Sequence, residues 1–278
     1  MEKYKIERDS VQETLVIPLY GRKMCTQKYP ALFTDKSAAE LCGKVDYDFA
    51  ALENRCKSFM YRFGILETAM RQYDLTAEVK DYLNVHSFAA VVNLGCGLDN
   101  TGRNCDNGKC KIYNIDLPDV IAVRNELLPA GEREQNIVAD INDTAWFERI
   151  DDSGGAVFIA AGVFYYFTTE KVIALLRAMS ERFVGGRLAF DSANRRAVKL
   201  MLKTWIRQAA IGGVDAYFAV SDAVKELSPR VPAAKISSRG YMLGYHDLKG
   251  VGVNAFFRWL SRIADGFMGM RIVRMDFD

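Results

Sequence analysis

The chain has 278 residues, of which 50% are apolar and 26% charged, and both values are typical of a globular protein. They exclude an intrinsically disordered chain, which would be poor in apolar residues and highly charged. The 37 basic and 35 acidic residues nearly balance, whereas nucleic-acid-binding proteins usually carry a clear basic excess or patch. We therefore expect no nucleic-acid partner.

The N-terminal residues contain no apolar core of signal-peptide length. The longest apolar run, AVFIAAGVFYYF at residues 156–167, is shorter than the ~20 residues that span a bilayer. The six cysteines form no CxxC pair and there are only two histidines, so no zinc-type set of ligands is evident. We expect free thiols, no metal, no membrane association and a cytoplasmic location.

In chain order, residues 1–86 are rich in helix formers and show no strand alternation, which predicts a helical N-terminal extension. From residue 87 onward, short apolar runs alternate with helical stretches. Continuous apolar strands joined by helices are typical of a parallel sheet buried on both faces, so a doubly wound α/β domain is predicted. The expected strands are residues 88–95, 111–116, 136–140, 155–161, 186–192, 235–243 and 271–277.

A basic amphipathic helix is predicted at residues 194–208. Its basic side chains recur at helical spacing and share one face, opposite an apolar face. This pattern is typical of a surface helix that packs on one side. Contact with a membrane or an acidic partner is the alternative. The basic residues are Arg196, Lys199, Lys203 and Arg207.

A glycine turn directly follows the first strand of the predicted sheet. Gly95 and Gly97 in NLGCGLDN lie at the carboxyl end of that strand, where open α/β sheets bind ligands. Glycines let the backbone turn sharply and let a ligand approach closely. The next strand ends in Asp116, whose carboxylate can accept hydrogen bonds from both hydroxyls of a ribose. These features predict a nucleoside site.

The turn favours S-adenosylmethionine over a dinucleotide. A dinucleotide fingerprint needs a third glycine, where this chain has Asn100, and Asp99 would repel a phosphate. S-adenosylmethionine has a ribose but no phosphate, and Asp140, followed by Ile141, can accept from the adenine amine. An NAD(P)-dependent oxidoreductase and a non-catalytic nucleoside-binding protein remain as alternatives, and a turn that merely connects strand and helix is the structural alternative.

Several segments carry a family resemblance: VVNLGCGLDN, YNIDLPDVIAVRNELLP, VADINDTAWFERI and FIAAGVFYYFTTEKVIALL, with ETLVIPLYGRKM and VDYDFAALENRCKSFMYRFGILETAM upstream. Together they resemble the leucine carboxyl methyltransferase superfamily. The bacterial branch, similar to tetracenomycin-type polyketide O-methyltransferases, is the better match. The resemblance runs from about Glu13 to the C-terminus and is firmest between Asp46 and Leu176.

The resemblance implies a class I methyltransferase fold, a mostly parallel seven-stranded sheet whose final strand is antiparallel. It further implies a helical cap at residues 1–86, a methyltransferase domain at 87–278 and a substrate-side insertion at about 193–270. It implies S-adenosyl-L-methionine as donor and S-adenosyl-L-homocysteine as product. The oligomeric state is left open.

Site residues follow from the resemblance position by position. Arg62 in YRFG matches the arginine that pairs with the donor's carboxylate, and a guanidinium suits that task because it grips a carboxylate with two hydrogen bonds. The family's Glu-Gly-Val after the fourth strand is here Ala161-Gly162-Val163, which removes one carboxylate from the site. The implied donor-binding residues are Arg62, Gly95, Cys96, Gly97, Asp116, Leu117, Asp140, Ile141 and Ala161.

The acceptor is expected to be a polyketide-like small molecule that reacts through a carboxyl or phenolic oxygen. Methyl transfer is an in-line displacement in which the enzyme aligns the reactants. A carboxylate needs no base, whereas a phenol with a pKa of ~10 benefits from one. His246 and Tyr166 are the catalytic candidates, although a histidine in such a loop can be structural. Candidate substrate residues are Tyr165, Asp191, Tyr241 and Tyr245.

Overall fold

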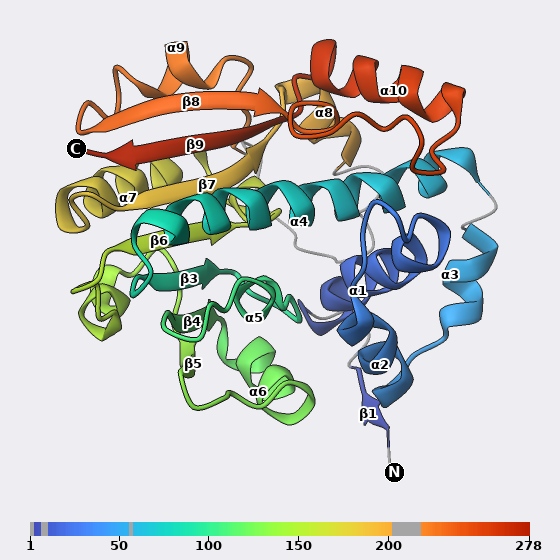
Figure 1. The fold of residues 1–278 in the computed structure, drawn as a ribbon, viewed down its shortest axis with the longest axis horizontal. Helices are drawn as coiled ribbons and strands as arrows, with labels where there is room; N and C mark the ends of the chain where they lie inside the picture. The colour runs from blue at the N-terminus through green and yellow to red at the C-terminus, as the bar shows by residue number, and fades with distance from the viewer. Residues whose placement is uncertain (1–2, 7–10, 56–57, 202–217) are drawn as a thin grey trace.

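The computed structural model describes residues 3–6, 11–55, 58–201 and 218–278 (Figure 1). Helices dominate the region before the central sheet, as the sequence predicts. Two unpredicted two-residue strands, β1 and β2, pair in parallel within it. The elements of this region are β1 (Tyr4–Lys5), α1 (Val11–Lys28), α2 (Lys36–Lys44), β2 (Val45–Asp46), α3 (Phe49–Arg55) and α4 (Phe59–Val85).

The long helix α4 joins the N-terminal region to the sheet. Its 27 residues correspond to about 40 Å at 1.5 Å per residue, and it lies across β6, β7 and β9 (Figure 1). Its inward side chains, among them Leu66, Met70 and Val79, are buried. The N-terminal region therefore packs on the sheet, and its division from the sheet domain at residue 86 stays a prediction.

Seven strands form one sheet in the order β5-β4-β3-β6-β7-β9-β8. Strands β3 to β7 pair in parallel, whereas β9 runs antiparallel to both β7 and β8. The predicted doubly wound, mostly parallel sheet with an antiparallel final strand is thus confirmed. The strands are β3 (Ala90–Leu94), β4 (Lys111–Asp116), β5 (Glu134–Val138), β6 (Ala156–Ala160), β7 (Arg187–Ser192), β8 (Ala234–Gly240) and β9 (Arg271–Phe277).

The end of β5 differs from the prediction by two residues. The sequence predicts a strand that includes Asp140, but β5 ends at Val138. The Asp140 carboxylate accepts hydrogen bonds from the backbone and side-chain nitrogens of Asn142, both at 2.9 Å. An aspartate that binds the backbone two residues onward favours a turn, so Asp140 lies in the loop beyond the strand.

Apolar side chains bury both faces of the sheet. In β6, Val157 and Ile159 belong to the cluster beneath α4, whereas Phe158 and Ala160 belong to the cluster on the opposite face. This alternation follows from the two-residue period of a strand. The helices on the two faces are α5 (Thr101–Asn104), α6 (Pro118–Leu127) and α7 (Thr169–Arg182), with 3₁₀ turns η1 (Thr144–Arg149) and η2 (Phe164–Tyr166).

Residues 193–270, predicted as a substrate-side insertion, include β8 and are therefore partly built into the sheet. The helix predicted at residues 194–208 is described only as α8 (Arg195–Met201), and the rest lies outside the described residues. The other helices here are α9 (Ala223–Leu227) and α10 (Ala255–Gly266). Within the described ranges, no helix combines the length and apolar character needed to cross a membrane, and the five described cysteines are free and buried.

Candidate functional site

The glycine turn after β3 needs its glycines for backbone conformation and for space. Gly95 and Gly97 have φ angles of 63° and 48°, in the left-handed region that side chains other than glycine rarely adopt. A Cβ atom on Gly95 would lie 2.6 Å from Cγ2 of Val163. The turn thus brings the end of β3 against the segment after β6.

Asp116 ties the glycine turn to the end of β4. Its Oδ2 accepts a hydrogen bond from the Gly97 backbone N–H, and its Oδ1 accepts one from Leu117, both at 2.8 Å. Burial raises the pKa of this carboxyl, and the two backbone hydrogen bonds oppose that rise. Because a carboxylate oxygen has two lone pairs, each oxygen keeps one for a ligand. The structure therefore brings together the two features that the sequence assigned to a nucleoside.

Asp99 has a structural role in the loop after β3. Its carboxylate accepts from Gln72 Nε2 at 2.8 Å, from Asn93 Nδ2 at 3.2 Å and from the Thr101 backbone N–H at 2.9 Å. These bonds hold it inside the fold, between α4 and the start of α5. Asp99 therefore fixes the loop in place.

The remaining predicted donor residues follow successive strands at the same edge of the sheet. Cys96 is buried in the turn after β3, and Leu117 is exposed after β4. Asp140 is exposed in the loop after β5, and the adjacent Ile141 is buried. Ala161 is half-buried after β6. Because the carboxyl ends of parallel strands meet at one edge, the fold places these positions along one line.

Arg62, which is expected to pair with the donor's carboxylate, lies near the start of α4. It is exposed in the first turn of α4, and its guanidinium lies over the ring of Phe257, 5.9 Å from the centroid. Arg71 lies nine residues, or about 13 Å, further along the same helix. The Arg71 guanidinium contacts the space at Gly162, where a Cβ atom would collide with it. Arg71 is thus a second arginine on α4 for the donor's carboxylate, and the role of Arg62 stays a prediction.

Arg71 belongs to a buried polar cluster at the ends of β6 and β7. Its Nη1 lies 3.4 Å from Oδ2 of Asp191, and Asp191 Oδ1 accepts from the Gly162 backbone N–H at 2.6 Å. Tyr165 also hydrogen-bonds Asp191. Three predicted substrate residues, Tyr165, Asp191 and Tyr241, therefore meet around an arginine that the sequence analysis did not single out.

The cluster's phenols remain protonated at neutral pH. Burial raises the pKa of Tyr165 and Tyr241 well above the usual value, and it raises the pKa of the half-buried Tyr166 as well. Glu67 lies one helical turn before Arg71, and burial raises the pKa of its carboxyl to about 7, with Arg71 opposing the rise. Glu67 was not predicted as a site residue. Its i, i+4 spacing from Arg71 is the sequence signal that could have found it.

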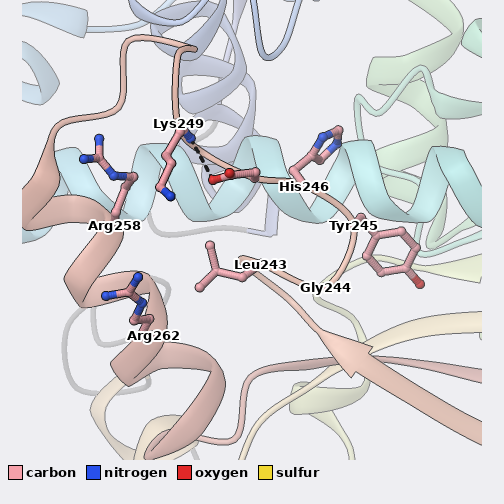
Figure 2. A pocket seen from close by; sticks show the side chains of 8 residues that line it. Leu243, Gly244, Tyr245, His246, Lys249, Arg258 and Arg262 are labelled. Atoms are coloured by element: carbon pink, nitrogen blue, oxygen red, sulfur yellow. Dashed lines mark hydrogen bonds between the residues drawn. The ribbon is translucent and has the colours of Figure 1, made fainter.

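A cavity of about 520 Å³ lies between the loop after β8 and α10 (Figure 2). Tyr245 and His246 lie at one end, and Lys249, Arg258 and Arg262 gather at the other. The Tyr245 hydroxyl donates to Glu78 Oε1 at 2.5 Å. This loop was predicted to line the acceptor site, and the structure places a cavity there.

His246 packs edge-on against α4. Its ring centroid lies 3.8 Å from that of Tyr73, and its Nε2 is buried with no hydrogen-bond partner among the described residues. Burial lowers the pKa of His246, so the imidazole is neutral at pH 7. A neutral imidazole with an unoccupied nitrogen has the protonation state that a general base requires.

Solved structures share this fold. A protein of Thermobifida fusca YX, described only provisionally as a methyltransferase, superposes with a TM-score of 0.65 at 14% identity, covering 97% of this chain and 95% of that one. The plantazolicin methyltransferase BpumL, solved with S-adenosylhomocysteine, matches with a TM-score of 0.50 at 14% identity, covering 96% and 98%. The sheet is therefore that of the class I methyltransferases.

Two curated relatives are similar in sequence. The tetracenomycin polyketide synthesis O-methyltransferase TcmP of Streptomyces glaucescens is 27% identical over 67% of each chain. The S-adenosyl-L-methionine-dependent methyltransferase dpfgK of Gibberella zeae is 25% identical over 98% of this chain and 96% of its own. The fold, the glycine turn and these relatives define a methyltransferase that uses S-adenosylmethionine as methyl donor.

The family follows from the sequence itself. Residues 16–180, more than half of the chain, match the model of the leucine carboxyl methyltransferase family. The chain belongs to that family, which confirms the resemblance seen in the glycine turn and its flanking segments. The chain is therefore described as a methyltransferase rather than as an oxidoreductase or a non-catalytic binding protein.

Proposed function

We propose that this protein transfers a methyl group from S-adenosylmethionine to a carboxyl or phenolic oxygen of a polyketide-like small molecule. The observation that carries the proposal is the Gly97–Asp116 hydrogen bond at the end of β3 and β4. It holds a carboxylate with free lone pairs beside a turn whose two glycines have no side chains of their own. The named activity of TcmP supports an oxygen acceptor of polyketide type.

The donor is proposed to bind along the carboxyl edge of the sheet. Asp116 accepts from the ribose hydroxyls, Asp140 and Ile141 hold the adenine, and Arg71, in place of Arg62, pairs with the methionine carboxylate. Glu67 supplies the negative charge that Ala161 lacks and faces the donor's ammonium. A guanidinium and a carboxylate one helical turn apart match the opposite charges of an amino acid.

The acceptor is proposed to approach from the loop after β8, with Tyr165, Tyr166 and Tyr241 between it and the donor. With a phenolic acceptor, His246 removes the proton and Tyr166 orients the oxygen. With a carboxylate acceptor no base is required, because the nucleophile is already ionised. In both cases the displacement breaks the sulfur–methyl bond and forms an oxygen–methyl bond, and the sulfonium becomes the neutral thioether of S-adenosylhomocysteine.

A binding and turnover experiment tests this function. Calorimetric titration with S-adenosylhomocysteine should show binding to one site, and NAD should show none. Radiolabelled S-adenosylmethionine should then transfer its methyl group to members of an aromatic polyketide panel, with a base-labile product for an ester and a base-stable one for an aryl ether. Binding of NAD in place of S-adenosylhomocysteine would contradict the proposal, and donor binding without turnover on any oxygen acceptor would contradict the proposed acceptor.

A further inference from the structure

The cavity between the loop after β8 and α10 carries an excess of positive charge. Lys249, Arg258 and Arg262 line it, and Asp247 is the acidic residue of the lining. Three cations and one carboxylate leave a net charge of +2, since burial keeps His246 neutral by lowering its pKa. The cations lie together at one end of the cavity (Figure 2).

Two of these cations have no acidic partner in the part of the chain that the structure describes. Lys249 and Arg262 are exposed side chains, and no ion pair is formed by either among the described residues. Arg258 differs, because its Nη1 donates to the Val253 carbonyl at 2.6 Å and thereby fixes the start of α10. Lys249 and Arg262 are therefore available to a ligand.

Asp265, a further acid on α10, is already engaged by the loop. Asp265 follows Arg262 by three residues on α10, but its carboxylate oxygens accept from the backbone N–H groups of Met242 and Leu243 at 2.7 and 2.9 Å. These bonds anchor the loop on α10. Asp265 thus holds in place the loop that frames the basic end, and it forms no ion pair with Arg262 among the described residues.

The loop that lines the cavity begins at a residue of the Arg71 cluster. Tyr241 is the first residue of the loop and interacts electrostatically with Arg71 and Asp191. Leu243, two residues further on, lines the cavity. Two residues of chain span at most about 7 Å. A volume of about 520 Å³ lies in the range of ~300–1,000 Å³ that holds a drug-sized molecule.

We propose that Lys249 and Arg262 bind an acid group of the methyl acceptor, a carboxylate or phosphate other than the oxygen that is methylated. This inference rests on the proposed function and adds the acceptor's charge to it. Arginine and lysine are the side chains that recognise such oxyanions.

The acid group that Lys249 and Arg262 bind is proposed to differ from the oxygen that is methylated because the charge of a reacting carboxylate changes during methyl transfer. A carboxylate that attacks the sulfonium loses its negative charge as the new bond forms. Cations beside it would stabilise the ground state more than the transition state and would raise the barrier. A cationic end therefore suits an anchoring acid, whereas the opposite end of the cavity, with His246, suits a neutral phenol.

The test compares two aromatic probes that differ only in charge, 3-hydroxy-2-naphthoate and 3-hydroxy-2-naphthamide. Each is titrated calorimetrically at low ionic strength into protein saturated with S-adenosylhomocysteine. The wild type should bind the acid about tenfold or more tightly than the amide, as expected for charge-assisted hydrogen bonds. The Lys249→Gln/Arg262→Gln double variant should lose that preference and bind the amide as before, and Lys235→Gln, an exposed lysine of β8, should retain it.

Three outcomes overturn the proposal: equal affinity of the wild type for acid and amide, a preference that the double variant keeps, or no acid binding at millimolar concentration. Inorganic phosphate titrated alone separates a free-phosphate site, because binding of phosphate without a preference for the aromatic acid also overturns it. Titration with S-adenosylhomocysteine provides the folding control. Failure of the wild type to bind that ligand would instead contradict the proposed function.

Discussion

Arg71 and Asp191, which lie 120 residues apart in the sequence, form an ion pair with Arg71 Nη1 3.4 Å from Asp191 Oδ2. The pair joins the middle of α4 to the end of β7, and the Gly162 N–H donates to the same carboxylate. Asp191 therefore fixes the Arg71 guanidinium beside the segment that follows β6. That position is why we assign the donor's carboxylate to Arg71.

Replacing Arg71 by lysine should weaken binding of S-adenosylhomocysteine about tenfold or more, since the charge is kept but the two-pronged hydrogen bonding is lost. Methylthioadenosine lacks the amino-acid end and should bind the variant and the wild type alike. Calorimetry with both ligands measures the contrast. Arg62→Lys is the matched control and should change neither affinity; an equal loss for both ligands in Arg71→Lys would indicate a structural role.

The sheet could be predicted from sequence because its strands carry their own signals. Lys111–Asp116 and Arg271–Phe277 match the predicted ranges residue for residue, and Gly97 and Asp116 meet as expected. The arginine could not be assigned in the same way. Arg62 and Arg71 lie on one helix with similar local patterns, and only the packing of α4 on β7 brings Arg71 beside Asp191.

Replacing Asp116 by alanine should weaken donor binding a hundredfold or more. Each charge-assisted hydrogen bond is worth about 1.5–3 kcal/mol, and a ribose offers two hydroxyls. Calorimetric titration with S-adenosylhomocysteine measures the effect, and Asp119→Ala, an exposed acid in the first turn of α6, serves as control. A change of less than about threefold, well short of one such bond, would exclude the ribose assignment.

Glu67 should make donor binding depend on pH around neutrality. Burial raises the pKa of its carboxyl to about 7, and the donor's ammonium favours the ionised form. Binding therefore releases a proton, and affinity should increase several-fold between about pH 6 and 8. In Glu67→Gln the affinity for S-adenosylhomocysteine should be lower and flat across that range. A wild-type affinity that does not vary with pH would contradict this role.

Asp74 should destabilise the fold as pH increases. Burial, with Asp265 and Glu78 nearby, raises its pKa to about 9, and neither carboxylate oxygen has a hydrogen-bond partner among the described residues. The usual unfolded value is about 3.9. The folded state thus binds more protons than the unfolded state between about pH 4 and 9, and the free energy of unfolding falls across that window.

Asp74→Asn should therefore raise Tm more at pH 8 than at pH 5. A stabilisation on the order of 1–2 kcal/mol at the higher pH corresponds to about 2–8 °C for a chain of this size. Thermal unfolding followed by circular dichroism at the two pH values gives the measurement. Glu148→Gln, at a side chain that is 82% exposed, should leave Tm unchanged at both. An equal shift at pH 5 and pH 8 would mean that the Asp74 carboxyl does not titrate as argued.

His246 should distinguish the two kinds of acceptor oxygen. For a phenolic acceptor, His246→Ala should lower kcat by about 10²–10⁴-fold, the usual contribution of a general base, and leave the affinity for S-adenosylhomocysteine intact. The acidic limb of the wild-type kcat profile should lie below about pH 6.5, because burial lowers the pKa of His246 from its ordinary value. Tyr73→Leu, which removes the ring against His246 and keeps the imidazole, should keep that limb. With a carboxylate acceptor, His246→Ala should leave kcat almost unchanged, and such a result on a confirmed phenol would remove His246 from the mechanism.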